Sequence, residues 1–182
     1  SGNGDEVDIA LDPLEGTTIT SKGMPNSLAV IAAAKKGCLL HSPDTYMNKI
    51  AIGNGYSNDV IDLDASVKDN IKSLADAKKV KPSDISACVL ERDRHSEIIE
   101  SLREIGSKVI LIPDGDVAGV MMTSQEEIDV DIYFGTGGAP EGVLAAAALQ
   151  CIGGQMQTRL VIRNDDEKKR AEKAGIKDLE KK

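Results

Sequence analysis

The stretch DPLEGTT, at residues 12–18, carries the most information about the fold of this 182-residue chain. Apolar and polar residues alternate over residues 7–11, which predicts a strand that ends at Asp12 and Pro13. Because proline has no amide hydrogen to donate to a sheet, we expect Pro13 to stop the strand and to point Asp12 and Glu15 the same way. Two carboxylates three residues apart on a tight turn suit one or two hard cations.

The second half of this stretch suits an anion. Gly16 permits a close approach of the backbone or an unusual φ, and Thr17 and Thr18 offer hydroxyls and amides. An ordinary strand-to-helix turn with solvated acids has the same residue types. Taken alone, these residues leave both interpretations open.

Strands and helices alternate along the rest of the chain. Residues 27–34 are small and apolar, and a turn at residues 35–37 leads into residues 38–41, which predicts a hairpin. The pattern also predicts strands at residues 49–52, 87–90, 109–112 and 131–134, and helices from Ser66 and over residues 95–105 and 141–151. This rhythm predicts an α/β fold with a mixed sheet. The charged tail, residues 163–182, is expected to be a solvated helix with a frayed end.

Composition excludes several classes of protein. The net charge of −8 argues against a nucleic-acid partner, since binding to the phosphate backbone needs a basic surface. No run of about 18 apolar residues predicts a membrane span, and the first residues do not resemble a signal peptide. We therefore expect a cytoplasmic protein that binds a small molecule.

Cysteine and histidine usage limits the metals that the chain can hold. Cys38, Cys88 and Cys151 are isolated in sequence and apolar in context, which predicts buried free thiols. His41 and His95 are too few for a histidine-based zinc site and are assigned structural roles. Any metal must then be held by carboxylates, which favours Mg²⁺ or Mn²⁺.

A glycine-rich turn at residues 135–141 follows one predicted strand and opens a helix. Pro140 suits the first helical position, and the amides of the turn can hold a phosphate at the positive end of the helix. Glu141 at this end is either an ordinary partner of the helix dipole or a ligand.

Polar groups also follow two other predicted strands. Arg92 and Arg94 can bind a phosphate between them, or they can be a solvated pair beside a helix start. Asp114 and Asp116 come at the end of the next strand, where ligands collect in α/β sheets, and form either a second metal site or a turn.

These motifs together resemble one family. Residues 12–17, DPLEGT, resemble the signature of the lithium-sensitive, metal-dependent phosphatases, and Glu15 with the preceding acidic strand resembles the class II fructose-1,6-bisphosphatases. Further similar motifs follow in the same order over nearly the whole chain: LAV at 28–30, KGC at 36–38, PDTYM at 43–47, RDRH at 92–95, PDGDVAG at 113–119 and GTGGAPEGV at 135–143.

The resemblance implies a layered sugar-phosphatase fold with mixed sheets and a role for each matching residue. It implies that Asp12, Glu15 and Thr17 are catalytic, and that Asp12, Glu15 and Glu141 bind Mn²⁺ or Mg²⁺. The residues implied to bind substrate are Glu15, Gly16, Thr17, Tyr46, Arg92, Asp93, Arg94, Asp114, Gly115, Asp116 and Gly138. The implied reaction removes the 1-phosphate of fructose 1,6-bisphosphate to give fructose 6-phosphate in gluconeogenesis. Sedoheptulose 1,7-bisphosphate is a possible further substrate.

Complete members of this family extend beyond the matched region at both ends, and their first segment supplies further acidic ligands. We therefore expect residues 1–56 to be the remnant of a metal-binding domain and residues 57–182 to be most of a second α/β domain, with the active site between them. The alternative is an inactive or regulatory relative that binds metal and phosphosugar without turnover. A weaker alternative, an enzyme for inositol phosphates or nucleotide 3′-phosphates, is disfavoured by Glu15, Arg92 and Arg94. The family also implies a homo-oligomer.

Overall fold

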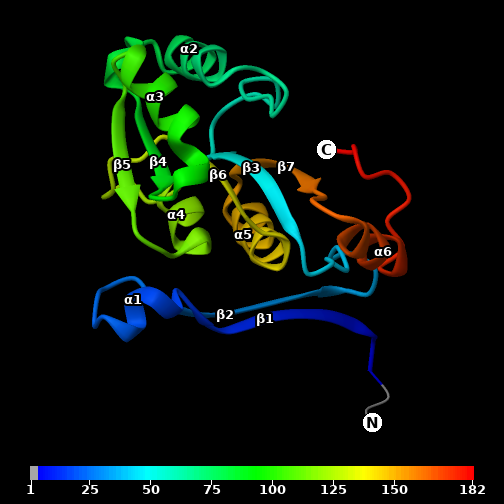
Figure 1. Ribbon diagram of the computed structural model, residues 1–182. Helices are drawn as coiled ribbons and strands as arrows, with labels where there is room; N and C mark the ends of the chain where they lie inside the picture. The colour runs from blue at the N-terminus through cyan, green and yellow to red at the C-terminus, as the bar shows by residue number, and fades with distance from the viewer. Residues whose placement is uncertain (1–3) are drawn as a thin grey trace.

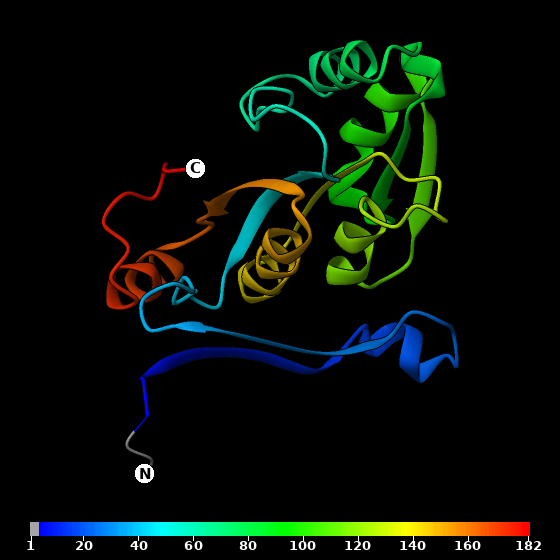
Figure 2. The same ribbon diagram turned by 180° about the vertical axis from the view of Figure 1, so that it is seen from behind.

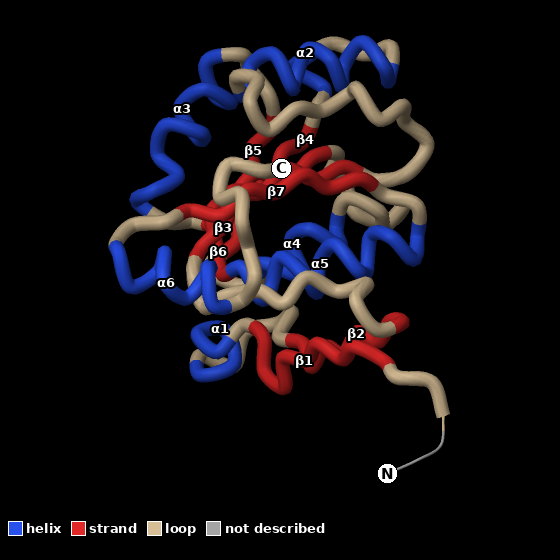
Figure 3. The backbone as a smooth tube through the Cα atoms, turned by 90° about the vertical axis from the view of Figure 1, so that its right-hand side faces the viewer, coloured by secondary structure: helices blue, strands red, loops and turns tan. Residues whose placement is uncertain are grey.

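The computed structural model describes residues 4–182 and has four layers (Figures 1 and 3). Strands β1 (Val7–Glu15) and β2 (Leu28–Lys35) form an antiparallel two-stranded sheet, which we call the β1–β2 ribbon. The short helix α1 (Thr17–Ser21) lies between them in the chain. Seen from behind, the ribbon again forms a layer of its own (Figure 2).

The second sheet has five strands in the order β5-β4-β6-β3-β7. Strand β4 is parallel to β5 and β6, whereas β3 is antiparallel to β6 and β7. The strands are β3 (Tyr46–Ile52), β4 (Ser86–Leu90), β5 (Lys108–Ile112), β6 (Ile132–Gly138) and β7 (Gln155–Val161). This mixed sheet confirms the predicted α/β class.

Helices cover both faces of the five-stranded sheet. Helices α2 (Val67–Lys78) and α3 (Ser96–Glu104) cover one face, and α4 (Asp116–Met122) and α5 (Ala139–Ile152) lie between the other face and the β1–β2 ribbon (Figure 3). Helix α6 (Asp165–Lys173) follows β7. Short 3₁₀ turns, η1 (Pro82–Asp84) and η2 (Asp93–His95), precede β4 and α3.

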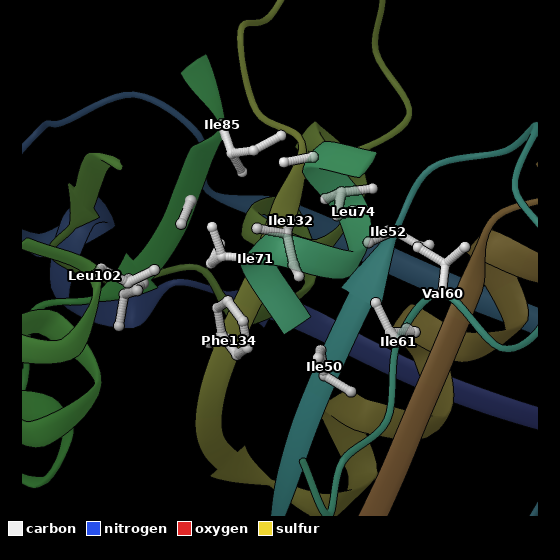
Figure 4. Close-up of a cluster of buried hydrophobic side chains, with 13 residues drawn as sticks. Ile50, Ile52, Val60, Ile61, Ile71, Leu74, Ile85, Leu102, Ile132 and Phe134 are labelled. Atoms are coloured by element: carbon white, nitrogen blue, oxygen red, sulfur yellow. The ribbon is translucent and has the colours of Figure 1, made fainter. Parts of the chain in front are cut away.

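The core consists of two mainly aliphatic clusters, one on each face of this sheet, which include Phe134 and Tyr133 respectively. Ile71 and Leu74 of α2 pack against Ile50, Ile132 and neighbouring strand residues in the first cluster (Figure 4). Every residue of β4 is buried, as expected for a parallel strand covered on both faces. Among residues 4–182, no helix has the length and apolar character that crossing a membrane requires.

Several local predictions are confirmed. The Ser66 side chain accepts a hydrogen bond from the Asp69 amide and caps α2. Pro140 lies in the first turn of α5, and Gly153 ends this helix in the left-handed conformation.

The prediction that Pro13 stops the first strand is wrong. Strand β1 continues to Glu15, with a register shift between Asp12 and Glu15. A proline is tolerated there because β1 pairs with β2 alone, so its other edge needs no amide donor. The predicted hairpin is also wrong: β2 pairs with β1, and residues 38–41 form no strand.

Other predictions are corrected in the second half of the chain and at the cysteines. Strand β7 was not predicted. Helix α6 exists as expected, yet Glu167 and Ala171 are buried, so the helix is packed rather than fully solvated. All three cysteines are free, but only Cys88 is buried, and Cys38 and Cys151 are exposed.

The domain division at residue 56 stays a prediction, and its first three residues lie outside those that the structure describes. Strand β3, before residue 56, lies within the five-stranded sheet between strands that come after it.

Candidate functional site

A cavity of about 380 Å³ lies where the ends of several strands meet the β1–β2 ribbon, and we call it the site cavity. Its walls come from the end of β1, the start of β3, the segments after β4 and β5, and the junction of β6 and α5. Most of the predicted site residues line it: Asp12, Glu15, Gly16, Thr17, Tyr46, Arg92, Arg94, Asp114, Asp116, Gly138 and Glu141.

Two predicted residues do not line the cavity. Asp93 faces a separate hollow, and its carbonyl accepts a hydrogen bond of 2.6 Å from the Ser96 hydroxyl. Gly115 precedes α4 with a φ of 94°, a conformation that favours glycine, and lies beside the Glu15 carboxylate.

Glu15 ends β1 with its side chain buried, at 4% exposure. Its Oε1 accepts a hydrogen bond of 3.3 Å from the Val117 amide at the start of α4, whereas its Oε2 is buried and has no hydrogen-bond partner in the part of the chain that the structure describes. Burial, together with the nearby charges of Asp116, Asp114 and Asp12, raises the pKa of Glu15 to about 7, against the lowering effect of the Val117 hydrogen bond. The chain thus buries a carboxylate among other acids.

The turn after Glu15 is also tied to the second sheet. Gly16 has a φ of 84°, and a Cβ there would lie 2.8 Å from Ile19 Cδ1, so the tight turn requires glycine. The Thr18 amide donates a hydrogen bond of 3.0 Å to Asp114 Oδ2. Asp114 therefore links the ribbon to the segment after β5.

Glu141 lies in the first turn of α5, and its Oε2 is also buried with no hydrogen-bond partner among the described residues. A Cβ on Gly138 would lie 2.6 Å from Glu141 Cδ, so the carboxylate folds back over the β6–α5 junction where only glycine leaves room.

The donor set suits a hard cation. Glu15 and Glu141 face one cavity, and each has a buried carboxylate oxygen that no group among residues 4–182 satisfies; Mg²⁺ and Mn²⁺ prefer such oxygens as ligands. Asp12 is half-buried, and its Oδ1 accepts a hydrogen bond of 3.0 Å from the Leu14 amide. Within residues 4–182, no three His, Cys, Asp or Glu side chains converge closely enough to form a metal site.

One edge of the cavity is basic. Arg92 donates a hydrogen bond of 2.6 Å to the Pro113 carbonyl, with Asp114 Oδ1 at 3.5 Å. Arg94 donates to the Thr136 carbonyl at 2.8 Å, and its guanidinium lies 5.2 Å from the centre of the Tyr46 ring. A further guanidinium, from Arg163, lies 4.4 Å from the same ring. The aromatic residue thus anchors two cations beside the cavity.

Two buried residues behind the cavity, Lys49 and Tyr133, were not predicted from the sequence. The Lys49 ammonium contacts Asp116 Oδ2 and donates a hydrogen bond of 2.8 Å to the Gly138 carbonyl. The Tyr133 hydroxyl donates to Asp116 Oδ1. The available signal for Lys49 was a lysine within an otherwise apolar strand, where a charge needs a buried partner.

His95 has the structural role that was predicted. Its Nε2 accepts a hydrogen bond of 2.8 Å from the Thr136 amide, so its Nδ1 carries the hydrogen and donates to the Leu90 carbonyl at 2.8 Å. The imidazole connects the end of β4 to β6 in the neutral form.

Comparison with known proteins gives one consistent result. The whole chain, residues 1–182, matches the family model described as "Bacterial fructose-1,6-bisphosphatase, glpX-encoded". It is 42% identical over 165 residues to "Fructose-1,6-bisphosphatase 1 class 2" of Escherichia coli (strain K12), with 91% of this chain and 49% of that protein covered. The identity and coverage are the same for "Fructose-1,6-bisphosphatase class 2" of Shigella flexneri. The chain thus spans about half the length of these relatives, and it belongs to the glpX-encoded bacterial fructose-1,6-bisphosphatase family.

Proposed function

We propose that this chain forms a large part of an enzyme that hydrolyses the 1-phosphate of fructose 1,6-bisphosphate, with Mn²⁺ or Mg²⁺ as cofactor. One observation carries the proposal: two buried carboxylates with unsatisfied oxygens, Glu15 and Glu141, face the same cavity as two arginines. A hard cation supplies the positive charge that the two carboxylates lack, and a bisphosphate supplies the negative charge that the two arginines lack.

In this proposal Glu15 and Glu141 hold the cation with Asp12, although the three carboxylates do not converge closely in the described structure, and further ligands come from outside the chain described here. The cation, when bound, neutralises phosphoryl oxygens and makes water a better nucleophile. Thr17, beside Glu15, orients the attacking water through its hydroxyl. Without a cation, the carboxylates of Asp12, Glu15 and Glu141 would repel a phosphate.

The other cavity residues hold the sugar and the second phosphate. Arg92 and Arg94 bind the distal phosphate, because their guanidinium groups are already fixed by backbone carbonyls. Tyr46, Asp114 and Asp116 bind sugar hydroxyls, and the glycines at the β6–α5 junction let the substrate approach the backbone. The ligand would thus lie between the β1–β2 ribbon and the five-stranded sheet, across the proposed boundary between residues 1–56 and 57–182.

We further propose that the enzyme works in the cytoplasm, in gluconeogenesis, as a homo-oligomer. Membership of the family supports these three statements.

The test is phosphate release from fructose 1,6-bisphosphate with Mn²⁺ or Mg²⁺. It compares this chain with a chain extended at both ends to the length of its relatives, and inositol 1-phosphate is the control substrate. We expect turnover of the bisphosphate by the extended chain and its loss in the Glu141→Gln variant. An extended chain that releases no phosphate, or a Glu141→Gln variant with full activity, would contradict the proposal.

A further inference from the structure

Lys49 is a fully buried cation behind the site cavity, and its side chain has 0% exposure. It projects from β3, contacts the Asp116 carboxylate and donates a hydrogen bond to the Gly138 carbonyl. It does not line the cavity, so it cannot contact a ligand there. Its effect on the site must therefore pass through these two partners.

Each partner of Lys49 lies at the start of a helix that supports one of the two unsatisfied carboxylates. Asp116 is the first residue of α4, and the amide of the next residue, Val117, donates to Glu15. Gly138 immediately precedes α5, and Glu141 lies in the first turn of that helix. One ammonium group thus connects the backbone supports of Glu15 and Glu141.

The backbone leaves little freedom around this ammonium. A Cβ on Gly137 would lie 3.3 Å from Lys49 Nζ and 3.1 Å from Asp116 Cγ. A Cβ on Gly142 would lie 3.1 Å from Lys49 Cε. Glycines on both sides of the β6–α5 junction therefore allow close packing of the backbone onto the lysine and its partner Asp116.

Packing alone does not require a charge at this position. An unbranched apolar side chain such as methionine fills a similar volume, and apolar replacements of buried ion pairs often fold as well as the original. What a methionine cannot supply is a direction: hydrogen bonds to a carboxylate and a carbonyl at the same time.

We propose that Lys49 is a positioning residue that holds the Glu15 and Glu141 carboxylates at the separation needed for one divalent cation. The proposal rests on the function proposed above. Partners that orient metal ligands without touching the metal typically contribute about 10–100-fold to metal affinity. Lys49 is expected to act within this range.

The experiment measures Mn²⁺ affinity by calorimetry and by electron paramagnetic resonance, with the chain extended to the length of its relatives. We expect Lys49→Met to weaken binding by about 10–100-fold. The double variant Lys49→Met/Asp116→Asn removes the stranded charge and is expected to recover stability but not affinity. In Lys49→Met the phosphatase rate should recover largely when the Mn²⁺ concentration is raised, which a general loss of folded protein would not do; the double variant is compared by Mn²⁺ affinity and stability alone, because Asp116 also lines the cavity.

A matched control is available at the other end of the same strands. Lys78 pairs with Asp131, whose second oxygen accepts the Ser86 amide at the start of β4. Lys78→Met breaks a partly buried ion pair far from the cavity and should lower stability with unchanged Mn²⁺ affinity. Equal losses of affinity in the Lys49 and Lys78 variants, or none in Lys49→Met, would overturn the proposal.

A second readout needs no metal. Hydrogen exchange of the Val117 and Ala139 amides should become faster in Lys49→Met than in Lys78→Met, because the first residues of α4 and α5 lose their common support. An extended wild-type protein that neither binds Mn²⁺ nor releases phosphate would refute the proposed function. Unchanged exchange at both amides would refute the role of Lys49 instead.

Discussion

At the scale of one residue, the buried Glu15 carboxylate lowers the stability of the metal-free fold and provides a proposed ligand for a cation. Its carboxylate is buried, has one oxygen without a partner and lies near three other acids. Each of these features disfavours the charged form in the absence of a cation. A bound divalent ion reverses the sign of the local field and turns the same carboxylate into a stabilising ligand.

The variant Glu15→Gln is therefore expected to be more stable than the wild type in metal-free buffer. The folded-state pKa of about 7 lies above the ordinary value of 4.5, so the charge of Glu15 opposes folding at pH values above both. We expect a gain of about 1–3 kcal/mol near pH 8, measured by urea unfolding, which shrinks as the pH falls towards 4.5. The same variant should lose Mn²⁺ affinity, and a variant that is less stable without metal would contradict this account.

Gly138 is a second residue whose replacement separates function from folding. Its φ of −56° is open to alanine, but a Cβ would lie 2.6 Å from Glu141 Cδ and displace that carboxylate. We expect Gly138→Ala to change stability by less than about 1 kcal/mol and to weaken Mn²⁺ binding by about 10–100-fold.

The control for Gly138→Ala is a double-mutant cycle with Glu141→Gln. If the alanine acts by displacing Glu141, it should add little to the loss that Glu141→Gln already causes. Additive losses would show that the alanine acts on the substrate or the backbone instead.

The sequence identified most residues of the cavity because each belongs to a short motif at the end of an element. It did not identify Lys49 or Tyr133, whose partner Asp116 lies 67 and 17 residues away in the chain. No local pattern encodes such pairs, since they arise only when β3 and β6 pair and α4 packs behind them.

At the scale of elements, His95 connects η2 with β6. Its ring is buried between the Leu90 carbonyl and the Thr136 amide, and burial lowers its pKa below the ordinary value of 6.5. The unfolded chain therefore takes up a proton at a higher pH than the folded protein does. Stability contributed by the neutral imidazole is present above pH 6.5 and is lost as the pH falls through the window below it.

Between about pH 7 and about pH 5 we expect the stability of the wild type to fall relative to that of His95→Gln, while the opposite contribution of Glu15 is common to both proteins. The measurement is the urea midpoint at each pH. His41 is exposed, so His41→Gln serves as the control and should keep the wild-type slope. An identical slope in all three proteins would show that His95 titrates normally in the folded state.

Helix ends, which depend on neighbouring residues, were predicted well, whereas strand pairing, which depends on residues distant in the sequence, was predicted less well. Ser66, Pro140 and Gly153 marked the ends of helices correctly, since caps depend on neighbouring residues. Strand pairing was harder: β2 pairs with β1, across α1, and not with the segment that follows it. Strand β7 was not predicted because polar residues such as Gln157 and Arg159 interrupt its apolar pattern. Their hydrogen-bond partners, the Ile61 carbonyl and Asp64, come close only in the folded chain.

At the scale of the whole molecule, α5 is the layer that joins the two sheets. It packs on the five-stranded sheet and also contacts β1 and β2. The inner face of β1 presents Asp8, Ala10 and Asp12 towards this layer, whereas Val7, Ile9 and Leu11 point outward. The predicted alternation of apolar and polar residues along β1 is therefore confirmed, but the apolar side of β1 faces away from the rest of the described chain.

This outward face leads to a prediction about the 182-residue chain in solution. Ile9 is 59% exposed and Ile31 is 70% exposed, next to Leu11 at 61%. A contiguous apolar patch on a two-stranded edge promotes self-association. We expect the chain to bind a hydrophobic dye and to scatter more light as the protein concentration rises. The double variant Ile9→Thr/Ile31→Thr should bind less dye and scatter less light. Threonine keeps the preference for a strand but removes the apolar surface. Val80, which is 39% exposed outside the ribbon, provides the control Val80→Thr, expected to behave as the wild type. Equal dye binding by all three proteins would show that the outer face of the ribbon is not the surface that binds the dye.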